Sequence, residues 1–123
     1  MNYVRLTTMA AVMGVTAGWM RGLVYQAVMD DERENPVKGS PYVMHTKQVV
    51  QALVAKRMRQ RSIGYDAIRA AIDGFEIDRR KVHEVQIAEG VKLVLNKSLL
   101  TLQARGLLKR ANELEGNSEE RAA

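Results

Sequence analysis

The chain has 123 residues, 46% of them hydrophobic and 27% charged, which is the composition of one globular domain or of a small domain with an appendage. It contains no cysteine, which excludes disulfides, thiol nucleophiles and cysteine-ligated zinc or iron–sulfur sites. The formal net charge of +5 suits a polyanionic partner, and the 5% aromatic content predicts an aliphatic core that favours helices.

The first segment predicts two short helices that meet at a tight turn. Residues 1–6 alternate in polarity, which is typical of a short strand or an extended lead-in. A first helix is expected from Thr8 to about Met13. Gly14 then supplies the left-handed backbone that a sharp corner needs, and Thr16 is the expected N-cap of a second helix ending near Ala27. This is the pattern of a helix-turn-helix, whose second helix can lie in a DNA major groove.

A polar stretch follows, over residues 30–41, and it holds both prolines of the chain and Gly39. No regular helix is expected to cross it. Residues 37–40 read as the tip of a tight hairpin, with residues 42–44 as its return strand. A small basic hairpin directly after a helix-turn-helix is a wing; the alternative is a plain surface loop.

Two further helices are expected before the middle of the chain. Thr46 is the predicted N-cap of a helix from Lys47 to Gln60, and a second helix is predicted from Tyr65 to Asp73, with Gly74 as its stop. The basic run at the end of the longer helix is open to two interpretations. It is either a solvated face favoured by the helix dipole or a phosphate-contacting face, and it consists of Lys56, Arg57, Arg59 and Arg61.

The last part of the chain predicts a hairpin and a helix. Residues 82–95 fit either a β-hairpin that turns at residues 88–90 or a helix with a ragged apolar stripe, and the hairpin is favoured because Gly90 weakens a helix. Asn96 or Ser98 is expected to cap a leucine-rich helix from about Leu99 to Leu114, which we expect to pack against a second copy. Residues 117–123 read as a polar, frayed tail.

Residues 1–74 resemble the winged helix-turn-helix of the MerR and excisionase superfamily, which also includes the DNA-recognition domains of some phage small terminase subunits. The matching motifs are Met9-Ala10, Gly14-Val15-Thr16, Met20-Arg21, the segment Pro36 to Met44 in place of the wing, and Thr46 with Val49 and Leu53 in the following helix. The resemblance implies a winged helix-turn-helix over these residues, so the expected fold is mainly α with a small β wing, followed by the C-terminal hairpin and helix predicted above. The chain is thus expected to consist of a DNA-binding domain (1–74), a dimerisation segment (75–116) and the tail (117–123).

Three departures distinguish the chain from the metal-sensing members of this superfamily. Gly22-Leu23 replaces the aromatic that usually follows the recognition-helix arginine, and the wing offers Lys38 and Tyr42 in place of an arginine and an aromatic. Gln48 stands where an acid is common. These changes favour the excisionase-like branch, or small regulators of phage and plasmid type.

The resemblance places a DNA-binding surface on the second helix and the wing. Arg21 would reach a guanine or a phosphate; the alternative is a surface arginine that pairs with Asp30 or Asp31. Trp19 would contact the DNA backbone, although a lone tryptophan in a small helical domain is more often part of the core. The full set of predicted DNA-binding residues is Thr16, Ala17, Gly18, Trp19, Arg21, Lys38, Tyr42 and Lys47.

No residue set in the sequence predicts catalysis, a metal or a cofactor. His45 and His83 lie in different elements without metal-ligand spacing, and the glycines are scattered singly. No apolar run reaches the length of a membrane span, so a cytoplasmic protein is expected.

The sequence therefore predicts a sequence-specific double-stranded DNA-binding protein, a transcriptional regulator or excisionase-like factor, that acts as a homodimer through its C-terminal segment. The alternatives are a small terminase-like DNA-packaging subunit and a protein-binding adaptor that kept the fold without binding DNA.

Overall fold

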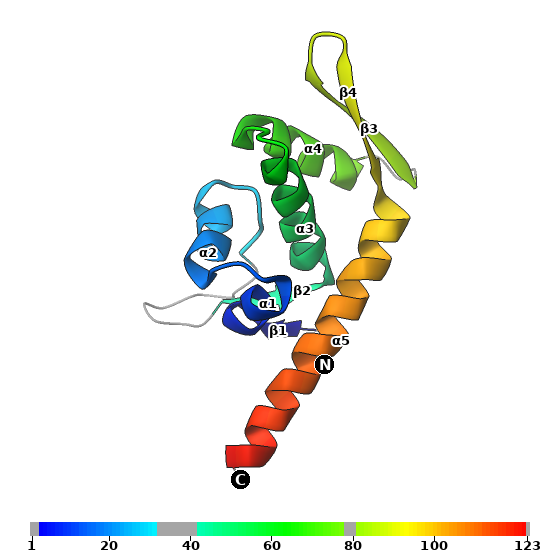
Figure 1. Cartoon of the computed structure of the whole chain (residues 1–123). Coiled ribbons are helices and arrows are strands. Elements are labelled where there is room, and N and C mark those ends of the chain that lie inside the picture. Colours follow the sequence, from blue (N-terminus) through cyan, green and yellow to red (C-terminus); the bar gives the residue numbers. More distant parts are fainter. Residues whose placement is uncertain (1–2, 32–41, 78–80, 123) are drawn as a thin grey trace.

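The computed structural model describes residues 3–31, 42–77 and 81–122, and this part of the chain is mainly helical (Figure 1). Two small antiparallel sheets of two strands each accompany the helices. The elements in chain order are β1 (Tyr3–Arg5), α1 (Leu6–Met13), α2 (Ala17–Tyr25), β2 (Val43–His45), α3 (Thr46–Gln60), α4 (Tyr65–Ile77), β3 (Val82–Ala88), β4 (Val91–Asn96) and α5 (Lys97–Ala122).

The corner between α1 and α2 has the geometry that the sequence predicts. Gly14 has a φ of 72°, and its N–H donates to the carbonyls at the end of α1. The Thr16 hydroxyl accepts a hydrogen bond from the Trp19 N–H at 3.0 Å, which confirms Thr16 as the N-cap of α2. α2 ends at Tyr25 rather than near Ala27, because Ala27 takes a left-handed conformation and the chain turns back to bury Val28 and Met29.

The first sheet joins the start of the chain to the start of α3. Val4 lies opposite Met44 in an antiparallel register, and both side chains are fully buried, so the core fixes this pairing. Residues 42–44 were expected to form the return strand of a hairpin, but in the described residues β2 pairs with β1. The predicted hairpin tip at residues 37–40 lies outside the described residues, as does Lys38.

α3 is the central helix, and its N-terminus differs from the prediction. Thr46 already belongs to the helix, and the N-cap is His45, whose N–H donates to the Gln48 side-chain oxygen at 2.9 Å. The prediction of Thr46 as the cap is therefore wrong by one residue, because β2 runs extended through His45 and leaves this residue at the boundary. The buried residues of α3 include Val49, Ala52 and Val54.

Gly74 does not stop α4, which continues to Ile77. The glycine lies where β3 crosses the helix, and a Cβ at this position would overlap the imidazole of His83. Because Gly74 has no side chain, the His83 ring can pack closely against the backbone of α4; the glycine does not end the helix. Residues 82–95 form the hairpin favoured from the sequence, with His83 opposite Leu95 and a left-handed Gly90 at the turn.

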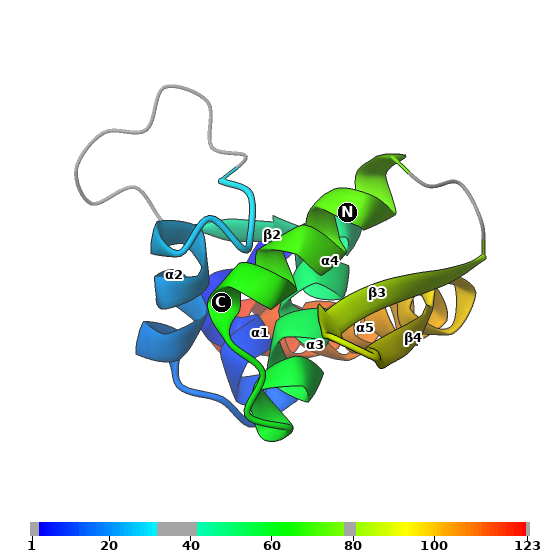
Figure 2. The same cartoon turned by 90° about the horizontal axis from the view of Figure 1, so that it is seen from above.

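α5 is a long helix that packs along α1 and α3 of its own chain (Figures 1 and 2). The Asn96 side chain caps it by accepting a hydrogen bond from the Leu99 N–H at 3.0 Å. Its buried residues Leu100, Ala104 and Leu108 belong to the same hydrophobic cluster as those of α1 and α3. α5 continues to Ala122, beyond the end predicted near Leu114, and therefore includes most of the segment that was expected to be a polar tail. None of the helices in the described ranges is long and apolar enough to cross a membrane.

Candidate nucleic-acid interface

α2 presents one face to solvent, and this face carries two projecting side chains, those of Arg21 and Tyr25. Met20 and Leu23 are buried on the opposite side of the helix. Arg21 and Tyr25 are four residues apart and therefore lie one above the other on the surface. Tyr25 is 80% exposed, which is the largest exposure among the large hydrophobic side chains of the described residues.

Two glycines lie on the same side of α2 as Arg21 and Tyr25. A Cβ added to Gly18 or Gly22 would meet no atom within 4 Å, so packing within the chain does not require a glycine at either position. A glycine inside a helix costs about 1 kcal/mol relative to alanine. The nine-residue helix therefore carries two destabilising residues on its exposed face. Because they have no side chains, a binding partner can approach the helix backbone closely there. We call Gly18, Arg21, Gly22 and Tyr25 the α2 face.

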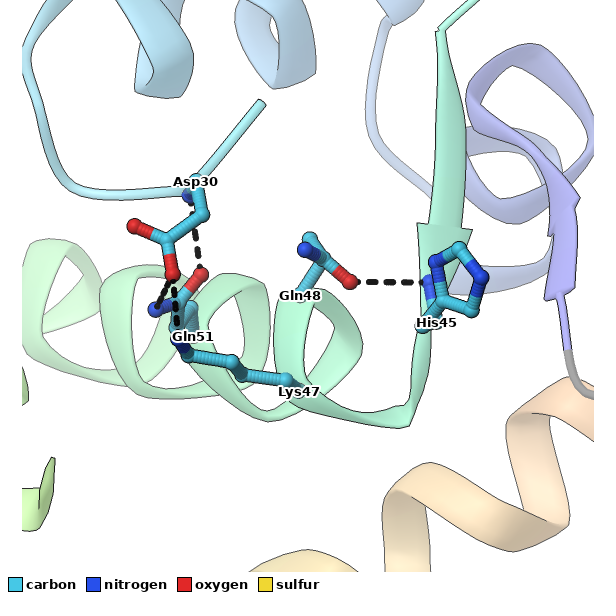
Figure 3. A network of polar contacts seen from close by, with 5 residues as sticks. All are labelled: Asp30, His45, Lys47, Gln48 and Gln51. Carbon is cyan, nitrogen blue, oxygen red and sulfur yellow. Dashed lines mark hydrogen bonds and ion pairs between the residues drawn. The ribbon is translucent and has the colours of Figure 1, made fainter. Parts of the chain in front are cut away.

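Arg21 does not pair with Asp30, one of the two carboxylates considered as its partner on the surface. Its side chain is exposed, and in the described ranges it forms no ion pair. Asp30 instead binds Lys47, with Nζ 2.7 Å from Oδ2 (Figure 3). This hydrogen bond from Lys47 is the main cause that lowers the pKa of the Asp30 carboxyl. The Arg21 guanidinium is thus available to an external anion.

Asp30 and Gln51 tie the chain that leaves α2 to the middle of α3. The Asp30 N–H donates to the Gln51 side-chain oxygen at 3.0 Å, and Gln51 Nε2 donates to Asp30 Oδ2 at 3.3 Å (Figure 3). Gln51 is almost fully buried, so its side chain is held in place by the packing around it. We call the contacts of Asp30 with Gln51 and Lys47 the Asp30 latch. Lys47, predicted as a phosphate contact, is engaged in the same latch and is about half exposed.

A second contact joins α3 to the corner between α1 and α2. Lys56 Nζ donates to the main-chain oxygen of Met13 at 2.6 Å, directly before the Gly14 turn. A cation is favourable there because the carbonyls at a helix C-terminus lack partners within the helix. α3 therefore holds the α1–α2 unit at two points, through Lys56 and through the Asp30 latch.

The rest of the basic run, at the end of α3 and directly after it, also makes contacts within the chain. Arg59 donates to the Ile63 carbonyl and lies 4.8 Å from the centre of the Tyr65 ring. Arg61 donates to the Arg57 carbonyl at 3.3 Å. Neither of the two sequence interpretations of this run anticipates that Lys56 and Arg59 fasten other parts of the fold.

α4 supports the C-terminal end of α2 through Arg69. Its Nη1 donates to the Gln26 carbonyl at 2.7 Å, and its Nη2 pairs with Asp66. Arg69 thus places a second guanidinium next to the residue that follows Tyr25. Neither Arg69 nor Tyr25 was predicted from the sequence. The signal for Tyr25 was its spacing of four residues from Arg21 and seven from Gly18.

The remaining predicted residues are divided between the surface and the core. Thr16 is exposed next to Gly18, while Ala17 and Trp19 are half-buried and pack against the core. Tyr42 is also half-buried against the core, and its carbonyl accepts a hydrogen bond from the Leu6 N–H. The structure therefore brings together Thr16, Gly18 and Arg21 and keeps Lys47 in the latch.

The described residues were also searched for metal-binding groups, and the chain was compared with known proteins. In the residues that the structure describes, no three histidine or acidic side chains are grouped so that they could hold a metal ion. In comparisons with known proteins, no family model, no curated protein sequence and no solved structure matches the chain.

Proposed function

We propose that the chain is a sequence-specific double-stranded DNA-binding protein of winged helix-turn-helix type, with α2 as its recognition helix. The α2 face is the observation that carries this proposal. It combines an arginine available to an external anion and a highly exposed tyrosine with two glycines that the packing does not require. Within this class we propose a transcriptional regulator or an excisionase-like factor of phage or plasmid type.

The chemistry of the α2 face suits the major groove. An arginine can donate two hydrogen bonds to O6 and N7 of a guanine, which is the commonest specific contact in protein–DNA complexes. The Tyr25 hydroxyl can bind a phosphate, and its ring can contact a thymine methyl group. Gly18 and Gly22 let the helix backbone approach the base edges, and the net charge of +5 attracts the phosphates.

The contacts that hold α2 in place at both of its ends support the same proposal. Sequence readout depends on holding a few side chains in register with the base edges. Lys56 fixes the start of α2 through Met13, and the Asp30 latch and Arg69 fix the chain after its end. Lys38 and Tyr42, in the segment proposed as the wing, would follow the neighbouring phosphates.

The proposal includes a homodimer that forms through residues 75–116, because a two-fold protein reads two half-sites at a fixed spacing. Exposed apolar side chains on the outer surface of α5 support this contact; Leu102 is 66% exposed and Leu114 48%. No catalytic activity, metal or cofactor forms part of the proposal.

The decisive experiment is selection of bound fragments from a pool of random double-stranded DNA, followed by footprinting of the enriched sequence. We expect a recurring motif that Arg21→Ala no longer enriches. Arg61→Ala, which removes an exposed arginine outside both the α2 face and residues 75–116, is the matched control and should enrich the same motif. Failure of the unaltered protein to enrich any motif would reject the proposal and favour the protein-binding adaptor.

A further inference from the structure

A groove lies between the end of α3, the strand β4 and the first turns of α5. β4 and α5 lie on the other side of α3 from α2 (Figures 1 and 2). The groove has a volume of about 260 Å³ and is open to solvent. Val54 and Met58 of α3 form one wall, and Leu99 and Leu100 of α5 form another. The groove is thus apolar on two sides, and Leu99 and the neighbouring Val94 are themselves 46% and 63% exposed.

The third side of the groove is the edge of a strand. Four consecutive residues of β4, 93–96, line it. Side chains alternate between the two faces of a strand, so an unbroken run of lining residues means that the strand edge borders the groove. In the described residues β3 is the only strand next to β4, and none of the residues that line the groove belongs to β3. The edge that faces the groove therefore presents main-chain N–H and C=O groups without a strand partner.

Two cations stand at the rim of this groove. Arg57 and Arg61 both line it, and within the part of the chain that is described neither forms an ion pair with a carboxylate. Arg61 is exposed and Arg57 is half-buried. An occupant that brings carboxylates to this rim gains charge-assisted hydrogen bonds, whereas a basic occupant is repelled.

We propose that this groove binds an extended, acidic segment of a partner protein, which adds a third strand to the edge of β4. Main-chain hydrogen bonds to β4 supply affinity, apolar side chains on one face of the added strand enter the groove, and acidic ones meet Arg57 and Arg61. Residues 93–96 offer about 13 Å of strand, enough to pair with three or four residues.

Charge disfavours a second copy of the chain as the occupant. β4 has the sequence VKLVLN, so a second β4 paired at this edge would bring Lys92 and no carboxylate to the two arginines. Pairing with β4 also leaves the outer surface of α5 free for the homodimer contact. The inference goes beyond DNA binding, and its test contains no DNA, so its failure would leave the proposal for α2 unaffected.

The test uses three fluorescently labelled hexapeptides with blocked ends, titrated with the full-length protein. The first alternates valine and glutamate, the second alternates valine and lysine, and the third is the glutamate peptide with alternate amides N-methylated. We expect the first peptide alone to bind, because the second has the wrong charge and the third cannot complete a strand ladder. Equal binding of the glutamate and lysine peptides, undiminished binding of the methylated one, or no binding of any peptide would overturn the proposal.

A pair of charge-matched variants tests the position of the site. Arg57→Gln combined with Arg61→Gln should weaken binding of the glutamate peptide roughly five- to tenfold, the range expected for two partly exposed ion pairs. Arg105→Gln combined with Lys109→Gln removes the same net charge from α5, outside the groove, and should leave binding unchanged. An equal loss in both variants would show non-specific attraction. A doubled solution mass that only the first variant abolishes would assign the groove to a second copy. Either result would contradict the proposal.

Discussion

Lys56 Nζ lies 2.6 Å from the main-chain oxygen of Met13, which makes the central helix α3 a clamp on the end of α1. The bond is partly buried and charge-assisted, and the Gly14 turn follows it directly. We predict that Lys56→Met, which keeps most of the side-chain volume, lowers the free energy of unfolding by about 1–2 kcal/mol. Urea denaturation measures this loss. Lys109→Met, at an exposed position of α5, should change the stability by much less; equal effects would mean that the clamp contributes nothing.

The two glycines of the α2 face predict a separation of stability from function. Gly18→Ala and Gly22→Ala should each raise the free energy of unfolding by up to about 1 kcal/mol, because neither new Cβ meets an atom within 4 Å. Both should weaken binding to the selected DNA motif, because the added methyl group holds the helix away from the base edges. Thermal denaturation and a DNA titration on the same samples measure the two effects.

Gly106→Ala is the matched control for these substitutions. Gly106 is also an exposed helical glycine without neighbours within 4 Å, but it lies on α5. The substitution should stabilise the protein to a similar degree. It controls for stability alone, because α5 carries the proposed homodimer contact. Unaltered DNA affinity in both α2 variants would remove close backbone approach from the proposal.

Arg21 and Tyr25 are expected to contribute differently to DNA binding. If Arg21 reads a base, Arg21→Ala should cost roughly 1–3 kcal/mol on the selected motif and little on unrelated DNA. A phosphate contact would instead weaken binding to all sequences and reduce the salt slope by about one. For Tyr25, comparison of Phe with Ala separates the hydroxyl from the ring. Full affinity of Arg21→Ala and Tyr25→Ala at every salt concentration would exclude the α2 face as the interface.

The local elements of this fold could be predicted because their signals are local. Gly14 and Thr16 mark a corner that depends only on backbone conformation and a side-chain cap, and Asn96 caps α5 in the same way. The hairpin over residues 82–95 follows from alternation and from Gly90. Each of these features involves residues close together in sequence, for which spacing carries the information.

The features that could not be predicted depend on contacts between distant segments. Gly74 read as a helix stop because nothing nearby in sequence indicates that His83 packs against it. Lys47 was predicted as a phosphate contact and Lys56 as part of a basic face, and only the tertiary structure shows that they bind Asp30 and Met13. Tyr25 was overlooked because the exposure of its ring depends on where the chain turns after α2.

The contact between Gly74 and His83 predicts the opposite response to alanine from that of the α2 glycines. Gly74→Ala should destabilise the protein by about 1–3 kcal/mol, because the new Cβ overlaps the imidazole and one of the two elements has to shift. His83→Ala in the same chain should recover part of the loss. A double-mutant cycle of unfolding free energies measures this coupling. Additive effects of the two substitutions would show that the helix and the hairpin adjust independently.

The Asp30 latch makes part of the stability depend on pH. The hydrogen bonds from Lys47 and Gln51 and the positive charge of Lys47 favour the ionised carboxyl and outweigh its partial burial, so the pKa of Asp30 is lower in the folded than in the unfolded chain. An unfolded aspartate has a pKa of about 3.9. A carboxyl whose pKa is lowered on folding stabilises the fold above the unfolded pKa, and this contribution is lost as the pH falls through the lowered folded pKa. We therefore expect Asp30→Asn to be less stable than the unaltered protein at pH 6–7, with a difference that shrinks as the pH falls below about 4. Urea denaturation at several pH values measures the difference, and Glu113→Gln on the exposed side of α5 controls for the general loss of an acid. A difference that stays constant across this range would show that the carboxylate charge of Asp30 does not hold the latch.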